Sequence, residues 1–216
     1  MSIKNEILSI SNSLNKNIKL IAVSKTRSIE EIMEAYNCGQ KSFGENRVQE
    51  LVNKYQKLPK DIEWHMIGHL QKNKVKYISK FISLIHSLDR LSLAIEIDKN
   101  AKKNNKIIDC LIQVKISKEE TKFGVSIENL ENLYERLLEF ENINITGLMG
   151  MATFTNNESL INEEFRSIKN YFDILNSKNK NLKILSIGMS DDYVIGIKNG
   201  SNMIRIGSKI FGKRNF

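Results

Sequence analysis

The feature that most constrains the fold is a repeated alternation of short apolar runs with longer amphipathic segments. The apolar runs recur about every 25 positions and lead into stretches of helical periodicity. We expect strands within residues 20–23, 41–46, 63–67, 81–85, 107–114, 143–149, 182–187 and 203–206. Strands that alternate with helices pair in parallel, and eight of them can close a TIM-type (β/α)8 barrel. The sequence therefore predicts an α/β barrel that forms one domain over residues 1–216.

An open doubly wound sheet is the competing architecture for this alternation. The barrel is favoured because polar, glycine-containing segments follow nearly every predicted strand instead of gathering at one point of the sheet. Apolar residues at helical spacing over residues 2–14 predict a leading amphipathic helix. Further helices are expected between Ser28 and Gly39, over 47–56, from near Leu70, and over 91–104, 127–140, 160–175 and 192–198.

The net charge of +8 invites a nucleic-acid interpretation. The excess, however, consists of scattered lysines among Asn and Ile, with no arginine-rich stripe, so we expect a solvated basic surface and no nucleic-acid partner. Cys38 and Cys110 have no metal-binding spacing and no signal peptide precedes them, which favours a reduced, cytoplasmic setting. No apolar run has the length of a membrane span, so no membrane association is expected.

The segment from Lys19 to Arg27 carries the first chemical signal. A buried strand over 20–23 delivers Lys25 to its exit, and Ser28 then opens a helix with a capping-box pattern. A desolvated lysine amine can form a Schiff base with an aldehyde. The alternative is that Lys25 is one more solvated lysine in a lysine-rich chain.

Two segments near the C-terminus have the composition of phosphate-binding loops. Residues 186–190, ending in Ser190, follow the seventh predicted strand, and Arg205, Gly207 and Ser208 belong to the eighth strand and its exit. Small residues let backbone N–H groups approach a phosphate, and in TIM barrels this site follows strands seven and eight. The glycines can equally serve as ordinary turn residues. We expect the lysine after strand one to face this phosphate site across the closed barrel, which favours a phosphorylated aldehyde such as pyridoxal phosphate.

Other strand ends supply polar groups of less certain role. Asn46 follows the second strand and can either join the site or cap the next helix. His69 and His86 are placed at the ends of strands three and four, without the carboxylate or cysteine partners of a metal site, so no metal is expected. Met189 is interpreted as a packing residue beside the site.

Taken together, these segments resemble the pyridoxal-phosphate homeostasis proteins, also called proline synthetase co-transcribed homologues. The resemblance runs from about Leu20 to Arg214. It rests on the blocks at 22–26, 43–46, 48–50, 64–71, 73–74, 86–87, 122–125, 147–149, 188–190, 203–207 and 210–214. So many blocks in order are far more specific than a single motif.

The resemblance implies a barrel like the N-terminal domain of alanine racemase, with Lys25 as the Schiff-base lysine. It implies that Ser190, Gly207 and Ser208 seat the phosphate and that Arg205 approaches the pyridine nitrogen. Asn46 would lie beside the ring, and Arg27 and Lys122 would be basic residues near the site. Independently of the resemblance, the strand-end residues His69, His86 and Met189 are expected around it. This chain departs from the family pattern in its short segment before Lys25, in Arg27 where lysine is common, and in the loop 150–155.

The resemblance also bears on catalysis. Racemases built on this barrel use a tyrosine from an additional β domain, and we expect that domain to be absent because the chain ends at Phe216. An arginine beside the pyridine nitrogen disfavours its protonation and weakens the ring as an electron sink. We therefore expect a non-catalytic, monomeric carrier or buffer of pyridoxal phosphate, with dependent apoenzymes as recipients. The alternatives are a single-domain amino-acid racemase, a Schiff-base aldolase and a nucleic-acid binder.

Overall fold

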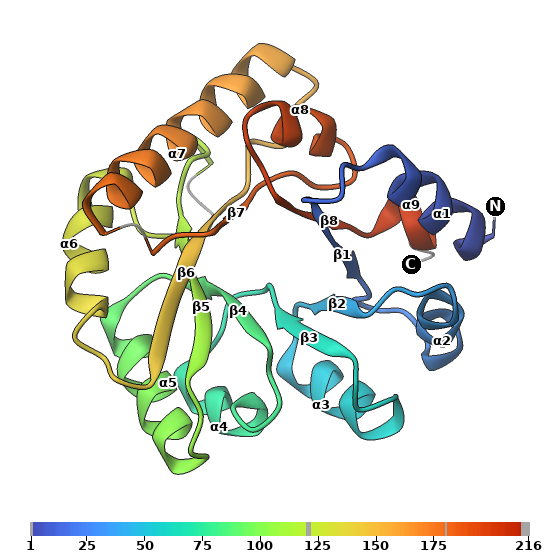
Figure 1. Ribbon diagram of the computed structural model, residues 1–216, viewed down its shortest axis with the longest axis horizontal. Helices are drawn as coiled ribbons and strands as arrows, with labels where there is room; N and C mark the ends of the chain where they lie inside the picture. Colours follow the sequence, from blue (N-terminus) through green and yellow to red (C-terminus); the bar gives the residue numbers. More distant parts are fainter. Residues whose placement is uncertain (1, 120–121, 180, 213–216) are drawn as a thin grey trace.

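The computed structural model describes residues 2–119, 122–179 and 181–212, and among these eight parallel strands close a barrel in chain order, with helices around the outside (Figure 1). The strands are β1 Lys19–Val23, β2 Ser42–Glu45, β3 Glu63–Met66, β4 Leu84–Leu88, β5 Ile108–Val114, β6 Ile143–Gly150, β7 Ile184–Ser186 and β8 Met203–Ile206. The last strand pairs with the first, in a register that sets Ala22 beside Ile206. The predicted TIM-type barrel is confirmed.

The strands are apolar on both faces because both faces are covered. Inward-facing residues form a small core inside the barrel, made by Ile21, Leu84, Leu111, Met149 and Met203. Outward-facing residues pack against the helices in a much larger cluster that includes Phe43 and Trp64, whose ring centroids are 6.0 Å apart. The alternation along each strand thus assigns one side chain to the barrel interior and the next to the helical layer.

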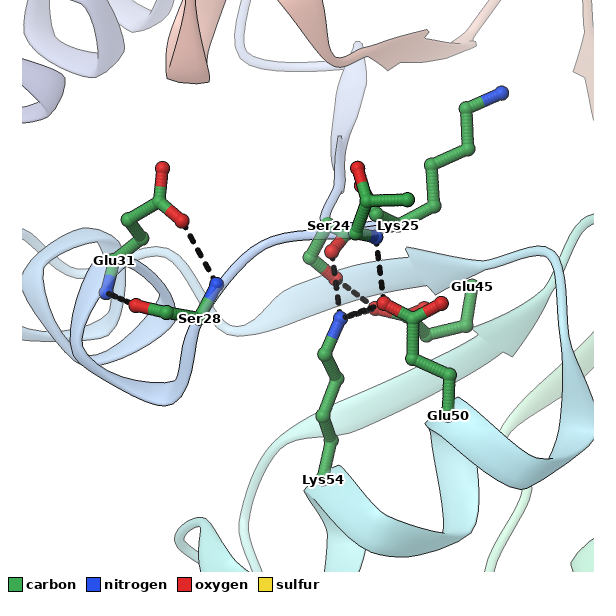
Figure 2. Close-up of polar contacts among 8 residues, drawn as sticks. Ser24, Lys25, Ser28, Glu31, Glu45, Glu50 and Lys54 are labelled. Carbon is green, nitrogen blue, oxygen red and sulfur yellow. Dashed lines mark hydrogen bonds and ion pairs between the residues drawn. The ribbon is translucent and has the colours of Figure 1, made fainter. Parts of the chain in front are cut away.

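The helices are α1 Ile3–Ser13, α2 Ile29–Asn37, α3 Val48–Lys57, α4 Val75–Ile78, α5 Leu91–Lys103, α6 Ile127–Leu137, α7 Glu158–Asn179, α8 Tyr193–Lys198 and α9 Ser208–Phe211, with a 3₁₀ turn over Lys72–Lys74. The predicted capping box of α2 is present, because Ser28 Oγ accepts from the Glu31 N–H and Glu31 Oε2 accepts from the Ser28 N–H (Figure 2). The leading helix α1 is also as expected and lies beside α9 (Figure 1).

The fourth strand was predicted wrongly. It runs over Leu84–Leu88, three residues later than the expected 81–85, so His86 and Ser87 lie inside the strand and not at its exit. Phe81 was assigned to the strand because it is apolar, but its ring lies outside the strand and stacks on Tyr55 of α3, with 3.7 Å between the ring centroids. Among the helices, α9 was not expected, and the helix expected from Leu70 starts later, with the 3₁₀ turn at Lys72.

No helix among the described residues is both long and apolar enough to span a membrane. Two residues of the C-terminal family block, Lys213 and Arg214, lie outside the described part of the chain.

Candidate functional site

Lys25 lies two residues past the end of β1, on the loop that leads into α2. Its side chain is half-buried and extends away from the polar groups beneath the loop (Figure 2). The next residue, Thr26, has a φ of 65°, a left-handed conformation that a β-branched residue rarely adopts. Backbone strain of this kind persists only where surrounding contacts impose it, and it concentrates at functional sites.

A buried group of charged side chains lies beneath the Lys25 loop, between β2 and α3 (Figure 2). We call Ser24, Glu45, Glu50 and Lys54 the Lys54 cluster. Lys54 Nζ donates to Glu45 Oε1 at 2.8 Å, to Glu50 Oε1 at 2.6 Å and to the Ser24 carbonyl at 2.7 Å. Burial raises the pKa of the Glu45 carboxyl above its ordinary value, and Lys54 opposes that shift.

The loops after β7 and β8 meet beside Lys25. The Gly207 N–H donates to Ser190 Oγ at 3.2 Å, and Ser208 then opens α9. Gly207 lies so close to β1 that a Cβ atom there would approach the Val23 Cβ to 3.2 Å. Since β1 pairs directly with β8, the predicted phosphate residues are neighbours of the lysine loop, and do not face it across the barrel.

Arg205 points into the barrel, on the same face of β8 as Met203. Its guanidinium donates to the Ser186 carbonyl at 2.8 Å, to Ser186 Oγ at 2.5 Å and to the Gly150 carbonyl at 2.9 Å. His86 Nδ1 lies 3.4 Å from Ser186 Oγ, and His86 Nε2 lies 2.9 Å from His65 Nδ1. We call His65, His86, Ser186 and Arg205 the Arg205 cluster.

Burial dominates the electrostatics of the Arg205 cluster. It lowers the pKa of Arg205 to about 10, so the guanidinium remains charged at neutral pH. Burial also lowers the pKa of His65 to about 3 and that of His86 well below 6.5, with the charge of Arg205 contributing to the shift at His86. Both imidazoles are therefore neutral, and the cluster carries one positive charge.

The other predicted residues occupy the same end of the barrel. Asn46 follows β2, and its backbone is so close to Gly68 that a Cβ at Gly68 would lie 2.4 Å from the Asn46 carbonyl oxygen. Glycine at position 68 is therefore required for the loops after β2 and β3 to touch. His69 follows directly and stacks on Phe123 from the loop after β5, at 3.9 Å between ring centroids.

Lys122 and Arg27 make contacts that tie loops together. Lys122 Nζ donates to the Ala152 carbonyl at 2.5 Å and pairs with Glu119 at 3.0 Å, which joins the loops after β5 and β6. Arg27 pairs with Glu31 at 3.2 Å, donates to the Gly212 carbonyl and lies over the Phe211 ring. Arg27 thus holds the end of α9 against the start of α2.

Met189 is a half-buried residue of the loop after β7, and its backbone N–H donates to Asp192 Oδ1. No sequence pattern pointed to Lys54, and Glu45 and Ser186 stood only inside longer motifs, without a role of their own. Glu50 and Lys54 are four residues apart on a helix, a spacing typical of exposed ion pairs. Glu45 stands in a strand with no sequence signal that links it to Lys54, so only the fold shows that they meet.

A cavity of about 450 Å³ opens at the opposite, amino end of the barrel, lined by residues that include Lys19, Glu63, His65 and Asp109. None of the predicted site residues lines it. Among the described residues, no three potential metal ligands are grouped to hold an ion.

The residues present fit a phosphorylated aldehyde. Lys25 offers an amine, and Ser190, which accepts from Gly207, can still donate its own hydroxyl hydrogen to a phosphate oxygen. In α9 the N–H groups of Ile210 and Phe211 donate to the Gly207 carbonyl, which leaves those of Ser208 and Lys209 as the donors that a phosphate could use. The hydrogen bonds of the buried Arg205 guanidinium go to neutral acceptors, and the Asp192 carboxylate acts on it through its charge, so an electron-rich group nearby is still favoured.

The closed eight-stranded barrel is the fold of the N-terminal domain of alanine racemase. The family model for the alanine racemase N-terminal domain matches residues 1–215. An alanine racemase of Clostridium difficile has the same fold, with a TM-score of 0.83, at 16% identity over 100% of this chain and 60% of its own.

Relatives with higher sequence identity show to which family with this fold the chain belongs. A pyridoxal phosphate homeostasis protein of Aquifex aeolicus is 47% identical over 92% of this chain and 88% of its own length. One of Helicobacter pylori is 41% identical over 90% and 87%. PipY of Synechococcus elongatus, solved with pyridoxal phosphate bound, is 31% identical over 98% of this chain and 100% of its own, with a TM-score of 0.90. The chain belongs to the pyridoxal phosphate homeostasis protein family.

Proposed function

We propose that this protein binds pyridoxal phosphate as a Schiff base on Lys25 and acts as a carrier and buffer of the cofactor. The observation that carries the proposal is the pairing of β1 with β8, which sets the Lys25 loop beside Gly207 and the start of α9. A lysine amine condenses with the aldehyde of this cofactor, with loss of one water, while the ring can serve as an electron sink.

Each predicted residue then has a role. Ser190, Gly207 and Ser208 hold the phosphate, and Arg205 faces the ring nitrogen with Asn46 beside the ring. Arg27, His69, Lys122 and Met189 hold the surrounding loops through the contacts described above, and His86 reaches Arg205 through Ser186. The relatives support the proposal, because their names give them a part in pyridoxal phosphate homeostasis and the PipY structure has the cofactor bound.

The same residues argue against turnover of amino acids. Arg205 stays charged at neutral pH, and a fixed positive charge beside the ring nitrogen opposes protonation of that nitrogen. A ring that is not protonated stabilises a carbanion poorly. We propose a monomer that passes the cofactor to apoenzymes that depend on it.

The first test is spectroscopic. The purified protein, incubated with pyridoxal phosphate, should gain a visible Schiff-base band, and borohydride should fix the cofactor covalently to the peptide that contains Lys25. Lys25→Ala should give neither signal. Lys19→Arg is the matched control, since it removes an amine from the other end of the same strand and keeps a cation for Glu63. Labelling of several lysines but not Lys25 would overturn the proposal.

The racemase alternative predicts exchange of the α-proton of an amino acid with solvent. The loaded protein should leave the α-proton of L-alanine unexchanged in deuterated buffer over hours, as Lys25→Ala does. Exchange by the wild type that is lost in Lys25→Ala would show that the protein is an enzyme.

A further inference from the structure

We propose that the Lys54 cluster is a positioning device for Lys25, in which Glu50 and Lys54 clamp the backbone on both sides of the reactive lysine. The inference rests on the proposed function, because it assumes that Lys25 is the residue that bonds to the cofactor. No motif pointed to this role, and Figure 2 shows the arrangement.

The residue before Lys25 is held at three of its atoms. The Ser24 N–H donates to the Gly44 carbonyl at 3.0 Å, the Ser24 carbonyl accepts from Lys54 Nζ at 2.7 Å, and Ser24 Oγ donates to Glu45 Oε1 at 2.6 Å. Ser24, Glu45 and Lys54 are all buried, so water does not compete for these bonds.

The residue after Lys25 is held by the same cluster. The Thr26 N–H donates to Glu50 Oε1 at 2.5 Å, and that oxygen also accepts from Lys54. Thr26 is the residue in the left-handed conformation, so the carboxylate stabilises a backbone geometry that threonine otherwise avoids. The strain and the clamp therefore lie at the same peptide.

Every hydrogen of the Lys54 ammonium group has an acceptor within the cluster. The ammonium group of Lys54 has three hydrogens and bonds three acceptors, one of them the backbone carbonyl of Ser24. A cluster that only joined α3 to β2 would need the two carboxylates but not the carbonyl of Ser24 or the N–H of Thr26. The direction of the Lys25 side chain follows from the backbone held on both sides of it.

Glu50 allows a sharp test, since its side chain is only partly buried and its replacement leaves the core intact. Glu50→Gln removes the charge and keeps an acceptor oxygen for Thr26, whereas Glu50→Ala removes both. Asp173→Ala is the control, because it breaks another i,i+4 ion pair, with Lys169, far from Lys25 in the chain. Each variant is mixed with pyridoxal phosphate, and the rate and equilibrium constant of Schiff-base formation are read from the absorbance.

We expect Glu50→Ala to slow and weaken Schiff-base formation by about tenfold, the effect of one charge-assisted hydrogen bond. Glu50→Gln should stay within about threefold of the wild type, and Asp173→Ala should equal it. Borohydride trapping should also spread from Lys25 to other lysines in Glu50→Ala only. Thermal unfolding of each variant establishes that the protein is folded at the assay temperature.

The outcomes separate the two proposals. Absence of the Lys25 adduct in wild type defeats the proposed function and, with it, the positioning role. A wild-type adduct with unchanged rate and affinity in Glu50→Ala overturns the positioning role alone and leaves a cluster that serves stability. Equal losses in Glu50→Gln and Glu50→Ala also overturn it, because the effect would then come from charge and not from the bond to Thr26.

Discussion

Lys54 lies outside the barrel wall, between β2 and α3, whereas Arg205 lies inside the barrel, and both side chains are buried. Lys54 meets two carboxylates, Glu45 and Glu50, within 2.8 Å. Arg205 donates hydrogen bonds to two carbonyl oxygens and to the Ser186 hydroxyl. That hydroxyl contacts His86, which in turn contacts His65, and both histidines are neutral. Lys54 is matched by opposite charges at contact distance, whereas Arg205 is hydrogen-bonded to dipoles and the Asp192 carboxylate acts on it through its charge.

The difference separates a structural cation from a functional one. A buried ion pair cancels its own field, so the Lys54 cluster fixes geometry and attracts little beyond it. A buried cation that is hydrogen-bonded to neutral acceptors keeps more of its field, although Asp192 offsets part of it, and desolvation lowers the pKa of Arg205. That field lies at the end of β8 where the proposed cofactor site begins.

The largest effect should be the acid sensitivity of the Arg205 cluster. His65 and His86 have depressed pKa values because they are buried, so each takes up a proton only on unfolding. The contribution of His65 to stability is complete above pH 6.5 and is lost as the pH falls toward 3, by up to about 1.4 kcal/mol per pH unit, and that of His86 is lost in the same direction. Urea unfolding between pH 7 and 5 measures this slope.

His86→Gln should reduce that slope by up to about 1.4 kcal/mol per pH unit. His69→Gln, at an exposed histidine, is the control and should leave the slope unchanged. An unaltered slope in His86→Gln would mean that the Arg205 cluster accepts protons in the folded state. The proposed difference between the Arg205 cluster and the Lys54 cluster would then be wrong.

Lys54→Met comes next in size. It leaves Glu45 buried without its counter-ion, and we expect a loss of about 3–5 kcal/mol in the free energy of unfolding at pH 7. Adding Glu45→Gln should restore part of the loss, because no buried carboxylate is then left unpaired. Lys169→Met, which breaks the exposed pair with Asp173, should cost less than about 0.5 kcal/mol. A similar cost for both lysines would show that burial adds nothing to the pair.

Arg205→Met should be milder, because it leaves two carbonyls and a hydroxyl without a donor but no carboxylate without a hydrogen-bonded cation, since Asp192 acts on Arg205 through its charge. We expect a loss of about 1–3 kcal/mol in urea unfolding at pH 7. The pKa of His86 should rise at the same time, since the charge of Arg205 is one of the causes that hold it down. A larger loss in the free energy of unfolding for Arg205→Met than for Lys54→Met would show that the hydrogen bonds of Arg205 stabilise the fold more than the ion pairs of Lys54.

The two clusters also mark what the sequence could and could not predict. The barrel and the positions of Lys25, Ser190 and Gly207 were accessible because apolar strands and polar strand ends are local patterns. Phe81 shows the limit, because an apolar ring that packs on α3 looks the same as a strand residue. Lys54 shows another: its burial depends on Glu45, nine residues away on a different element.

The smallest expected effect is a pH dependence of stability due to Glu45, with a sign opposite to that of the histidines in the Arg205 cluster. Burial raises the pKa of Glu45, so the folded protein keeps a proton that the unfolded chain loses near 4.5. This contribution to stability is present below pH 4.5 and is lost as the pH rises through the raised value, opposite to the histidines. Glu45→Gln imitates the protonated form and lacks this loss.

The stability difference between Glu45→Gln and wild type should therefore shift toward the variant as the pH rises from 4.5, by at most about 1.4 kcal/mol per pH unit. Urea unfolding of both proteins in the same buffers measures it. The acid-side loss due to His65 and His86 should be unchanged in the variant. A difference that stays constant from pH 4.5 to 7 would mean that Lys54 holds Glu45 ionised throughout. The two buried cations would then still differ in their partners, but not in how their surroundings respond to protons.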